Sequence, residues 1–147
     1  LLRAGDGKGA ARALPPGMAL GSLDLEAILA RIHWETGDFA TVAECLKDVD
    51  LAKNMQGYES ELLLRAEALY AVERYEEAQL VFEALAREGV FMSQAGFRLA
   101  GIHLAQGRTR QGRLLLRELS ENGEAGRWAI LARELLADLR LGALEES

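Results

Sequence analysis

The chain has few of the residues that define a sheet protein, a disulfide-stapled domain or a membrane protein. It contains one cysteine, so no internal disulfide can form, and a single thiol does not identify the redox compartment. Only two residues are proline and few are β-branched, although 50% are hydrophobic, which disfavours β-sheet. No apolar run approaches the roughly 18 residues that predict a membrane span. These shortages favour a helical protein.

An excess of positive charge is also missing. The formal net charge is −6 at pH 7, which argues against nucleic acid or an anionic membrane surface as the main partner. A charge of this size mainly favours solubility. With 147 residues, the chain is expected to form one domain with a continuous hydrophobic core.

The most regular stretch is residues 62–88, LLLRAEALYAVERYEEAQLVFEALARE. Apolar residues recur at helical spacing in both of its halves: Leu62, Ala66 and Leu69, then Tyr75, Ala78, Phe82 and Leu85. A tight polar turn at Glu73 and Arg74 separates the halves, so the pattern predicts a helical hairpin. One hairpin of this size cannot bury its own apolar faces, which predicts further copies.

The chain contains those copies, because five sets of residues share offsets of 36 and then 34 residues. The sets are Ala30, Ala66 and Ala100; His33, Leu69 and His103; Gly37, Glu73 and Gly107; Val42, Ala78 and Gly112; and Leu46, Phe82 and Leu116. A helix–turn–helix unit with a period near 34 is typical of tetratricopeptide repeats. The central unit, with its small Ala66, ERYEEA at 73–78 and Phe82, resembles that family.

The resemblance covers roughly residues 24–121 and implies an all-α, right-handed α-solenoid of tetratricopeptide-type hairpins. About three repeats and a C-terminal capping helix are expected. It implies no single function, because members of this family bind many unrelated partners. Residues 1–21 are expected to form an irregular segment or part of a preceding repeat. The three repeats are expected within 22–122, at about 23–56, 59–91 and 93–122. The capping helix is expected at 124–141.

Two predictions are specific enough to compare with a structure: the bounds of one helix and the orientation of the residues in another. The second helix of the first repeat is expected from Ala40 to about Val49. In the capping helix, the expected inward residues are Trp128, Leu131, Ala132, Leu135 and Leu139. The expected outward residues are Arg127, Arg133, Glu134, Asp138 and Arg140, which give the end of the array a polar face. The chain starts without Met and in mid-repeat, which predicts a piece of a longer protein.

The residues that bear reactive groups have structural interpretations. His33 and His103 occupy equivalent positions two repeats apart, so they should not converge on one metal ion. Cys45 has no nearby His or cluster of cations to activate it as a nucleophile. The glycine-rich GDGKG at 5–9 lacks the spacing of a phosphate-binding loop. No catalytic residue, metal site, cofactor or small-molecule substrate is therefore predicted.

Two charged runs also favour structural interpretations. Glu73, Glu76 and Glu77 suit a turn and a solvated helix start, where carboxylates interact well with the helix dipole. A basic patch could meet an acidic partner, but Glu118 and Glu121 dilute it, and an ordinary solvated face is the favoured interpretation. That patch comprises Arg108, Arg110, Arg113 and Arg117.

The family's ligand groove lies on the first helix of each repeat. Transferring its positions to this chain implies a partner-binding stripe with one spacing in every repeat, which begins at Ala27 in the first repeat. The stripe comprises Arg31, Trp34, Glu35, Leu63, Glu67, Tyr70, Phe97, Gly101 and Leu104. Its apolar members are expected to form an exposed strip, although the N-terminal segment or a neighbouring chain could cover some of them. The Lys and Asn that clamp a terminal carboxylate in chaperone-binding relatives are replaced by Ala27, Arg31 and Leu64.

Two hypotheses follow for function. One is a scaffold or adaptor that binds a peptide or helix of another protein in an apolar concave groove. The other is a structural spacer or self-assembling module of a larger repeat protein, in which the strip packs against another copy or an adjoining repeat. The Leu/Ala/Arg/Gly-rich composition is typical of bacterial proteins and leaves the cytoplasm and the cell envelope both open.

Overall fold

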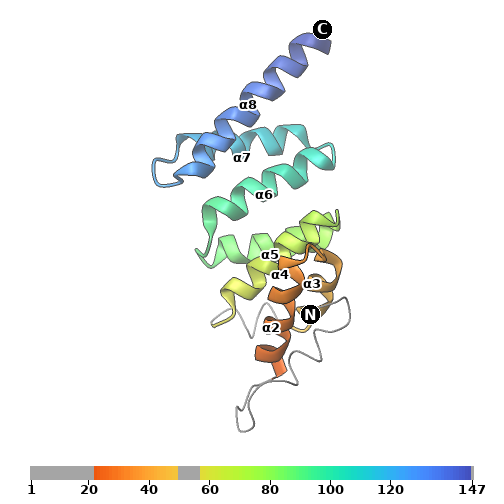
Figure 1. Cartoon of the computed structure of the whole chain (residues 1–147). Helices are drawn as coiled ribbons and strands as arrows, with labels where there is room; N and C mark the ends of the chain where they lie inside the picture. The colour runs from red at the N-terminus through yellow and green to blue at the C-terminus, as the bar shows by residue number, and fades with distance from the viewer. Residues whose placement is uncertain (1–21, 50–56, 147) are drawn as a thin grey trace. The chain divides into compact units, whose positions relative to one another are not determined.

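The computed structural model describes residues 22–49 and 57–146, which form seven α-helices and no strand (Figure 1). This confirms the all-α class for the described residues. The expectations for 1–21 lie outside them. The chain divides into two compact units, 1–81 and 82–147, whereas its length predicts one domain. Within the units, most of the packing is between helices that are neighbours in sequence.

The first unit contains α2 (Ser22–Glu35), α3 (Phe39–Cys45), α4 (Glu59–Ala71) and the beginning of α5 (Tyr75–Arg87). Helix α3 packs against both α2 and α4. The buried side chains of this unit come from all four helices and from the segment after α3. They include Leu29, Ala30, Val42, Leu46, Val49, Leu62, Ala66, Leu69, Ala78 and Val81.

The second unit contains the rest of α5, α6 (Met92–Ala105), α7 (Thr109–Glu121) and α8 (Arg127–Glu146). Helix α7 packs against both α6 and α8, as Figure 1 shows. One buried cluster joins α6, α7 and α8: Ala100, Leu116, Leu119, Ala125, Ala129 and Ala132. Four of its six members are alanine, which lets the helix axes approach closely.

The turns within the three hairpins have the same geometry. Gly37, Glu73 and Gly107 all adopt left-handed backbone conformations, with φ of 79°, 63° and 80°. In each turn this residue's N–H donates to the carbonyl three residues back, at 3.1, 3.0 and 3.1 Å. The next N–H donates to the carbonyl five residues back, at 2.9, 2.9 and 2.7 Å. These are the paired hydrogen bonds of a Schellman helix end, and they confirm all three predicted turns.

The equivalent core positions agree as well. Leu46, Phe82 and Leu116 are fully buried, and so are the three equivalent alanines Ala30, Ala66 and Ala100. The repeated offsets in the sequence therefore correspond to repeated local structure. Gly89, with φ of 74°, ends α5 with the same pair of hydrogen bonds.

One predicted helix boundary and one predicted side-chain orientation are wrong. Helix α3 ends at Cys45 rather than near Val49. The chain continues as turns with i→i−3 hydrogen bonds that keep Val49 buried, and the Arg65 guanidinium donates to the Val49 carbonyl at 3.2 Å. In α8, Leu131 is exposed while Ala129 is buried, because the side that packs against the cluster passes through Ala129 and Ala132. The other inward and outward assignments in α8 are confirmed.

Candidate functional site

In the first unit, an aromatic residue of the predicted stripe near the end of α2, and another near the end of α4, packs against an aromatic residue at the start of the next helix. The Trp34 ring on α2 packs edge-on against Phe39 at the start of α3, with centroids 4.8 Å apart. The Tyr70 ring on α4 packs in the same way against Tyr75 at the start of α5, at 5.6 Å. The two pairs are equivalent in the repeat register. They hold the last turn of the first helix against the second helix, and each stripe aromatic is half-buried.

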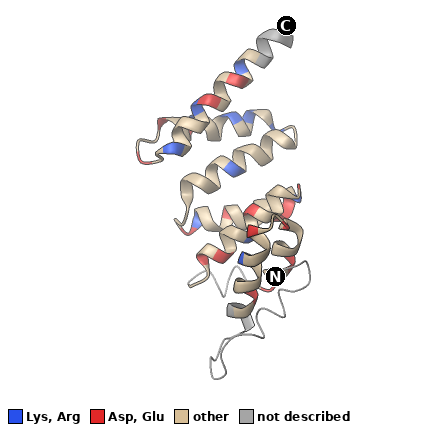
Figure 2. Ribbon diagram, in the orientation of Figure 1, with Lys and Arg blue, Asp and Glu red and all other residues tan. Residues whose placement is uncertain are grey.

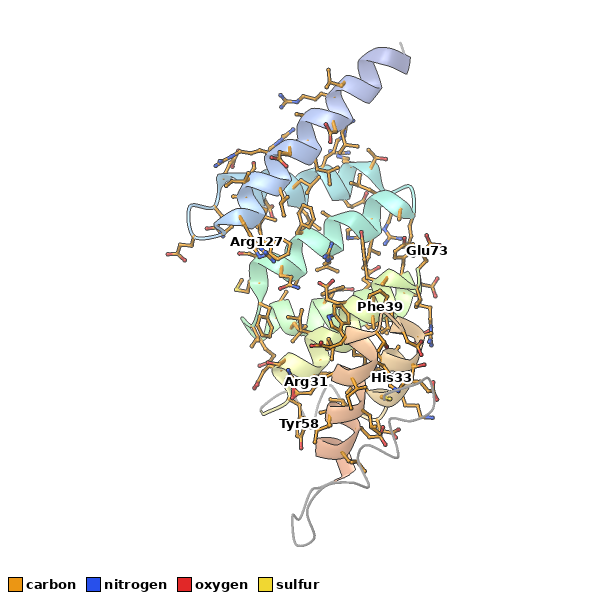
Figure 3. All side chains as sticks on the ribbon, in the orientation of Figure 1. Arg31, His33, Phe39, Tyr58, Glu73 and Arg127 are labelled. Atoms are coloured by element: carbon orange, nitrogen blue, oxygen red, sulfur yellow. The ribbon has the colours of Figure 1, made fainter. Side chains whose placement is uncertain are left out.

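The polar members of the stripe lie beside a surface cavity. Arg31 on α2 is 63% exposed, and its guanidinium lies 3.9 Å from the Glu61 carboxylate on α4 (Figure 3). The cavity has a volume of about 260 Å³, and its lining includes Arg31, Ile32, Glu35 and Thr36. Two predicted stripe residues thus border a hollow on α2. Ala27, the first predicted groove position, is buried rather than accessible.

Leu63 and Glu67 continue the stripe along α4 and are both half-buried. The stripe on α2 and α4 therefore combines partly accessible apolar groups with an exposed cation and an exposed carboxylate. This arrangement can hold an apolar side chain of a ligand and pair with charges beside it.

The stripe in the second unit is less accessible than expected. Phe97 and Leu104 on α6 pack against the cluster that α6, α7 and α8 share. The Phe97 ring lies 5.6 Å from the Trp128 ring, and the Arg127 guanidinium lies 4.5 Å from the Trp128 ring centroid. The expectation of an exposed apolar strip is thus corrected: its members are half-buried, and the part on α6 packs against the cluster shared with α7 and α8. Gly101 is half-buried too.

The two histidines stabilise turns in opposite ways. His33 Nδ1 lies 3.7 Å from the Asp38 carboxylate, an attractive contact when the imidazole is protonated. His103 Nδ1 instead accepts a hydrogen bond from Arg108 Nε at 2.7 Å, which requires that nitrogen to be unprotonated. Burial, followed by the nearby Arg108 charge, lowers the His103 pKa below its usual value. Asp38 also caps α3, where it accepts a hydrogen bond from Thr41 N–H.

Among the described residues, no group of three or more His, Cys, Asp or Glu could hold a metal ion. Cys45 is half-buried and forms no disulfide. Glu73 lies in the turn, and Glu76 and Glu77 are exposed in the first turn of α5, as the sequence predicts. None of the described helices is long and apolar enough to cross a membrane.

The basic patch divides into two parts. Arg108 is half-buried and engaged with His103, whereas Arg110 and Arg117 project into solvent from α7. Arg113 is half-buried, and its Nε atom is buried without a hydrogen-bond partner in the described residues. Figure 2 shows the basic residues along α7.

Sequence reasoning missed two exposed leucines on the second helices of the repeats. Leu80 on α5 is 64% exposed and Leu114 on α7 is 55% exposed. The signal was available, because the two residues are 34 positions apart, the offset that relates Glu73 to Gly107. Most of the helical neighbours of both leucines are polar, which indicates that they lie on the outward side of their helices.

Comparison with known proteins finds no match at any level: no family model, no curated protein and no solved structure matches the chain. The class that the described residues define is thus an all-helical protein with three similar hairpin turns.

Proposed function

We propose that the chain is an interaction scaffold or adaptor built from tetratricopeptide-type repeats, and that it binds a peptide or helix of another protein. The observation that supports the repeat assignment most is the shared turn geometry at Gly37, Glu73 and Gly107. Because the turns are equivalent, residues at the same offset before each turn occupy equivalent places on their helices. A surface that combines such places is suited to binding rather than to catalysis.

Within the stripe, the residues on α2 and α4 are the stronger candidates for contact with a partner. Arg31 and Glu35 are exposed beside the cavity, and Trp34, Leu63 and Tyr70 are only half-buried. Partly exposed aromatic residues next to charged groups are typical of residues that dominate binding energy. The α6 residues contribute less, because Phe97 and Leu104 are engaged with the cluster of the second unit.

The test is a pull-down from the source cells with the intact chain, repeated with Tyr70→Ala. If Tyr70 is an anchor, its truncation weakens binding by about 2 kcal/mol, or roughly thirtyfold. Ile130→Ala is the matched control, because Ile130 is 54% exposed on α8 and outside the stripe. Equal capture by all three chains would exclude the stripe as the binding site.

A spacer or self-assembling module is the second candidate. It is favoured by the Phe97–Trp128 contact, in which the chain itself covers part of the strip. Light scattering separates the candidates, since a spacer that assembles through the strip gains mass with concentration and loses this behaviour in Tyr70→Ala.

A further inference from the structure

The outward faces of α5 and α7 have the same pattern with opposite charge. Each has one exposed leucine at its centre, Leu80 or Leu114. The residues four before and three after that leucine are Glu76 and Glu83 on α5. The corresponding pair on α7 is Arg110 and Arg117. Residues at these spacings lie beside one another on a helix surface. We call these the acidic face and the basic face.

Glu76, Arg110 and Arg117 are exposed, and Glu83 is half-buried near His103. Within residues 22–49 and 57–146, no salt bridge involves Glu76, Glu83, Arg110 or Arg117. Further acid on α5 comes from Glu77, but its carboxylate is already paired with Arg74 at 2.7 Å. On α7, Glu118 also adjoins Leu114, so that the basic face keeps one carboxylate.

We propose that the acidic face of one copy of the chain binds the basic face of a second copy. Leu80 of one copy would pack against Leu114 of the other, and the two glutamates would meet the two arginines. The contact is complementary in charge and removes both leucines from water. Since the two faces are different surfaces, the contact is heterologous, and each copy retains a free face for the next one.

The chemistry of both faces favours a second copy over nucleic acid. The second unit has nine Lys and Arg against nine Asp and Glu, so it has no net positive charge. The first unit, which contains Glu76 and Leu80, has eight against fourteen and is the more acidic part of the chain. A leucine at the centre of the basic face offers an apolar anchor that a phosphate backbone does not need.

The expected association is weak and depends on salt. A contact of one helix face with another buries less than the roughly 1,200 Å² at the lower end of stable interfaces. Rim charges at such a contact are screened by added salt, since the Debye length falls from about 10 Å at 0.1 M to about 3 Å at 1 M. The weight-average mass of the chain should therefore rise with concentration at low salt and return to that of a monomer at high salt.

Sedimentation velocity with charge-reversed chains tests the proposal. Arg110→Glu/Arg117→Glu makes both faces acidic, and Glu76→Arg/Glu83→Arg makes both faces basic. Each variant alone should remain monomeric, with association weakened about tenfold or more, while an equimolar mixture of the two should associate again. Arg140→Glu is a single-site control on α8, is exposed, and should behave as wild type where Arg117→Glu does not.

Three outcomes would overturn the proposal: a wild-type chain that stays monomeric at millimolar concentration and low salt, a mixture that fails to associate, or self-association unchanged by either double variant. A fluorescent single-stranded oligonucleotide provides the remaining arm. If it binds the wild-type monomer and not Arg117→Glu, the basic face serves nucleic acid and the proposal fails. The result is independent of the stripe on α2 and α4, because Tyr70→Ala leaves both faces intact.

Discussion

Replacing Gly112 by alanine sets two known effects against each other. Gly112 lies in α7, where alanine is favoured over glycine by about 1 kcal/mol in a helix interior. However, a Cβ at this position would meet Leu104 Cγ at 2.8 Å, Leu104 Cδ2 at 2.9 Å and the Ala100 carbonyl oxygen at 3.1 Å. One of these atoms belongs to the backbone and another is the branch point of a half-buried side chain, so relief requires α6 and α7 to shift.

Overpacking of this kind costs about 1–3 kcal/mol. After the gain from helix propensity is subtracted, Gly112→Ala should destabilise the chain by about 1 kcal/mol. Gly96 in α6 is the matched control, because a Cβ there has nothing within 4 Å and its φ is not positive. Gly96→Ala should thus stabilise by about 1 kcal/mol through propensity alone.

Urea unfolding followed by circular dichroism at 222 nm measures both variants. The difference between them cancels the propensity and isolates the steric cost, expected at about 1–3 kcal/mol. In a Leu104→Ala background the clash is largely removed, so Gly112→Ala should cost less there than in the wild type. If Gly112→Ala stabilises the chain as much as Gly96→Ala does, helices α6 and α7 are not in close contact at this point and the packing argument is wrong.

Three further predictions concern other parts of the fold. Ala66→Leu should lower the free energy of unfolding by about 1–3 kcal/mol through overpacking at a fully buried site, whereas Ala71→Leu on the exposed side of the same helix should not. Equal melting temperatures for the two variants would place Ala66 outside the core. Phe97→Ala should lower the melting temperature clearly, because the ring packs against the cluster of the second unit; an unchanged melting temperature would return Phe97 to an accessible strip. The free energy of unfolding should fall as the pH drops through about 6.5, because His103 has a lowered folded pKa and the unfolded chain takes up the proton first. His103→Gln should flatten this pH dependence, and an unchanged slope in that variant would show that His103 does not cause it.

The turns could be predicted from sequence because local chemistry and register agree. Gly37 and Gly107 supply the left-handed conformation that the end of a helix requires, at little cost. Glu73 adopts the same conformation although a side chain there costs about 1–2 kcal/mol. Its own residue type gives no indication of this, and only its place in the repeat does.

The accessibility of the stripe could not be predicted in the same way. Helical spacing puts Phe97 and Leu104 on one side of α6, but it does not say which neighbouring helix covers that side. Trp128 reaches Phe97 from α8, about thirty residues later in the chain, and the packing of α8 decides the contact. A pattern within one helix contains no information about that packing.

The error at Leu131 has a related cause. Leu131 and Ala129 both adjoin the helical stripe that contains Ala132, and hydrophobicity favours the leucine as the inward residue. The structure instead buries Ala129, because a small residue allows α8 to lie close to the cluster. Leu80 and Leu114 illustrate the same limit, since apolar residues on a helix need not face the core.

The measurement that most directly tests the proposed binding role is site-specific photo-crosslinking in extracts of the source cells. A photoreactive residue at Glu35, which is exposed in the stripe on α2, should form an adduct with a partner protein, and Tyr70→Ala in the same chain should reduce it. A photoreactive residue at Arg140, which is exposed on α8, should not form that adduct. An adduct absent at Glu35, equally strong at Arg140, or unaffected by Tyr70→Ala would contradict the proposal that the stripe on α2 and α4 binds a partner.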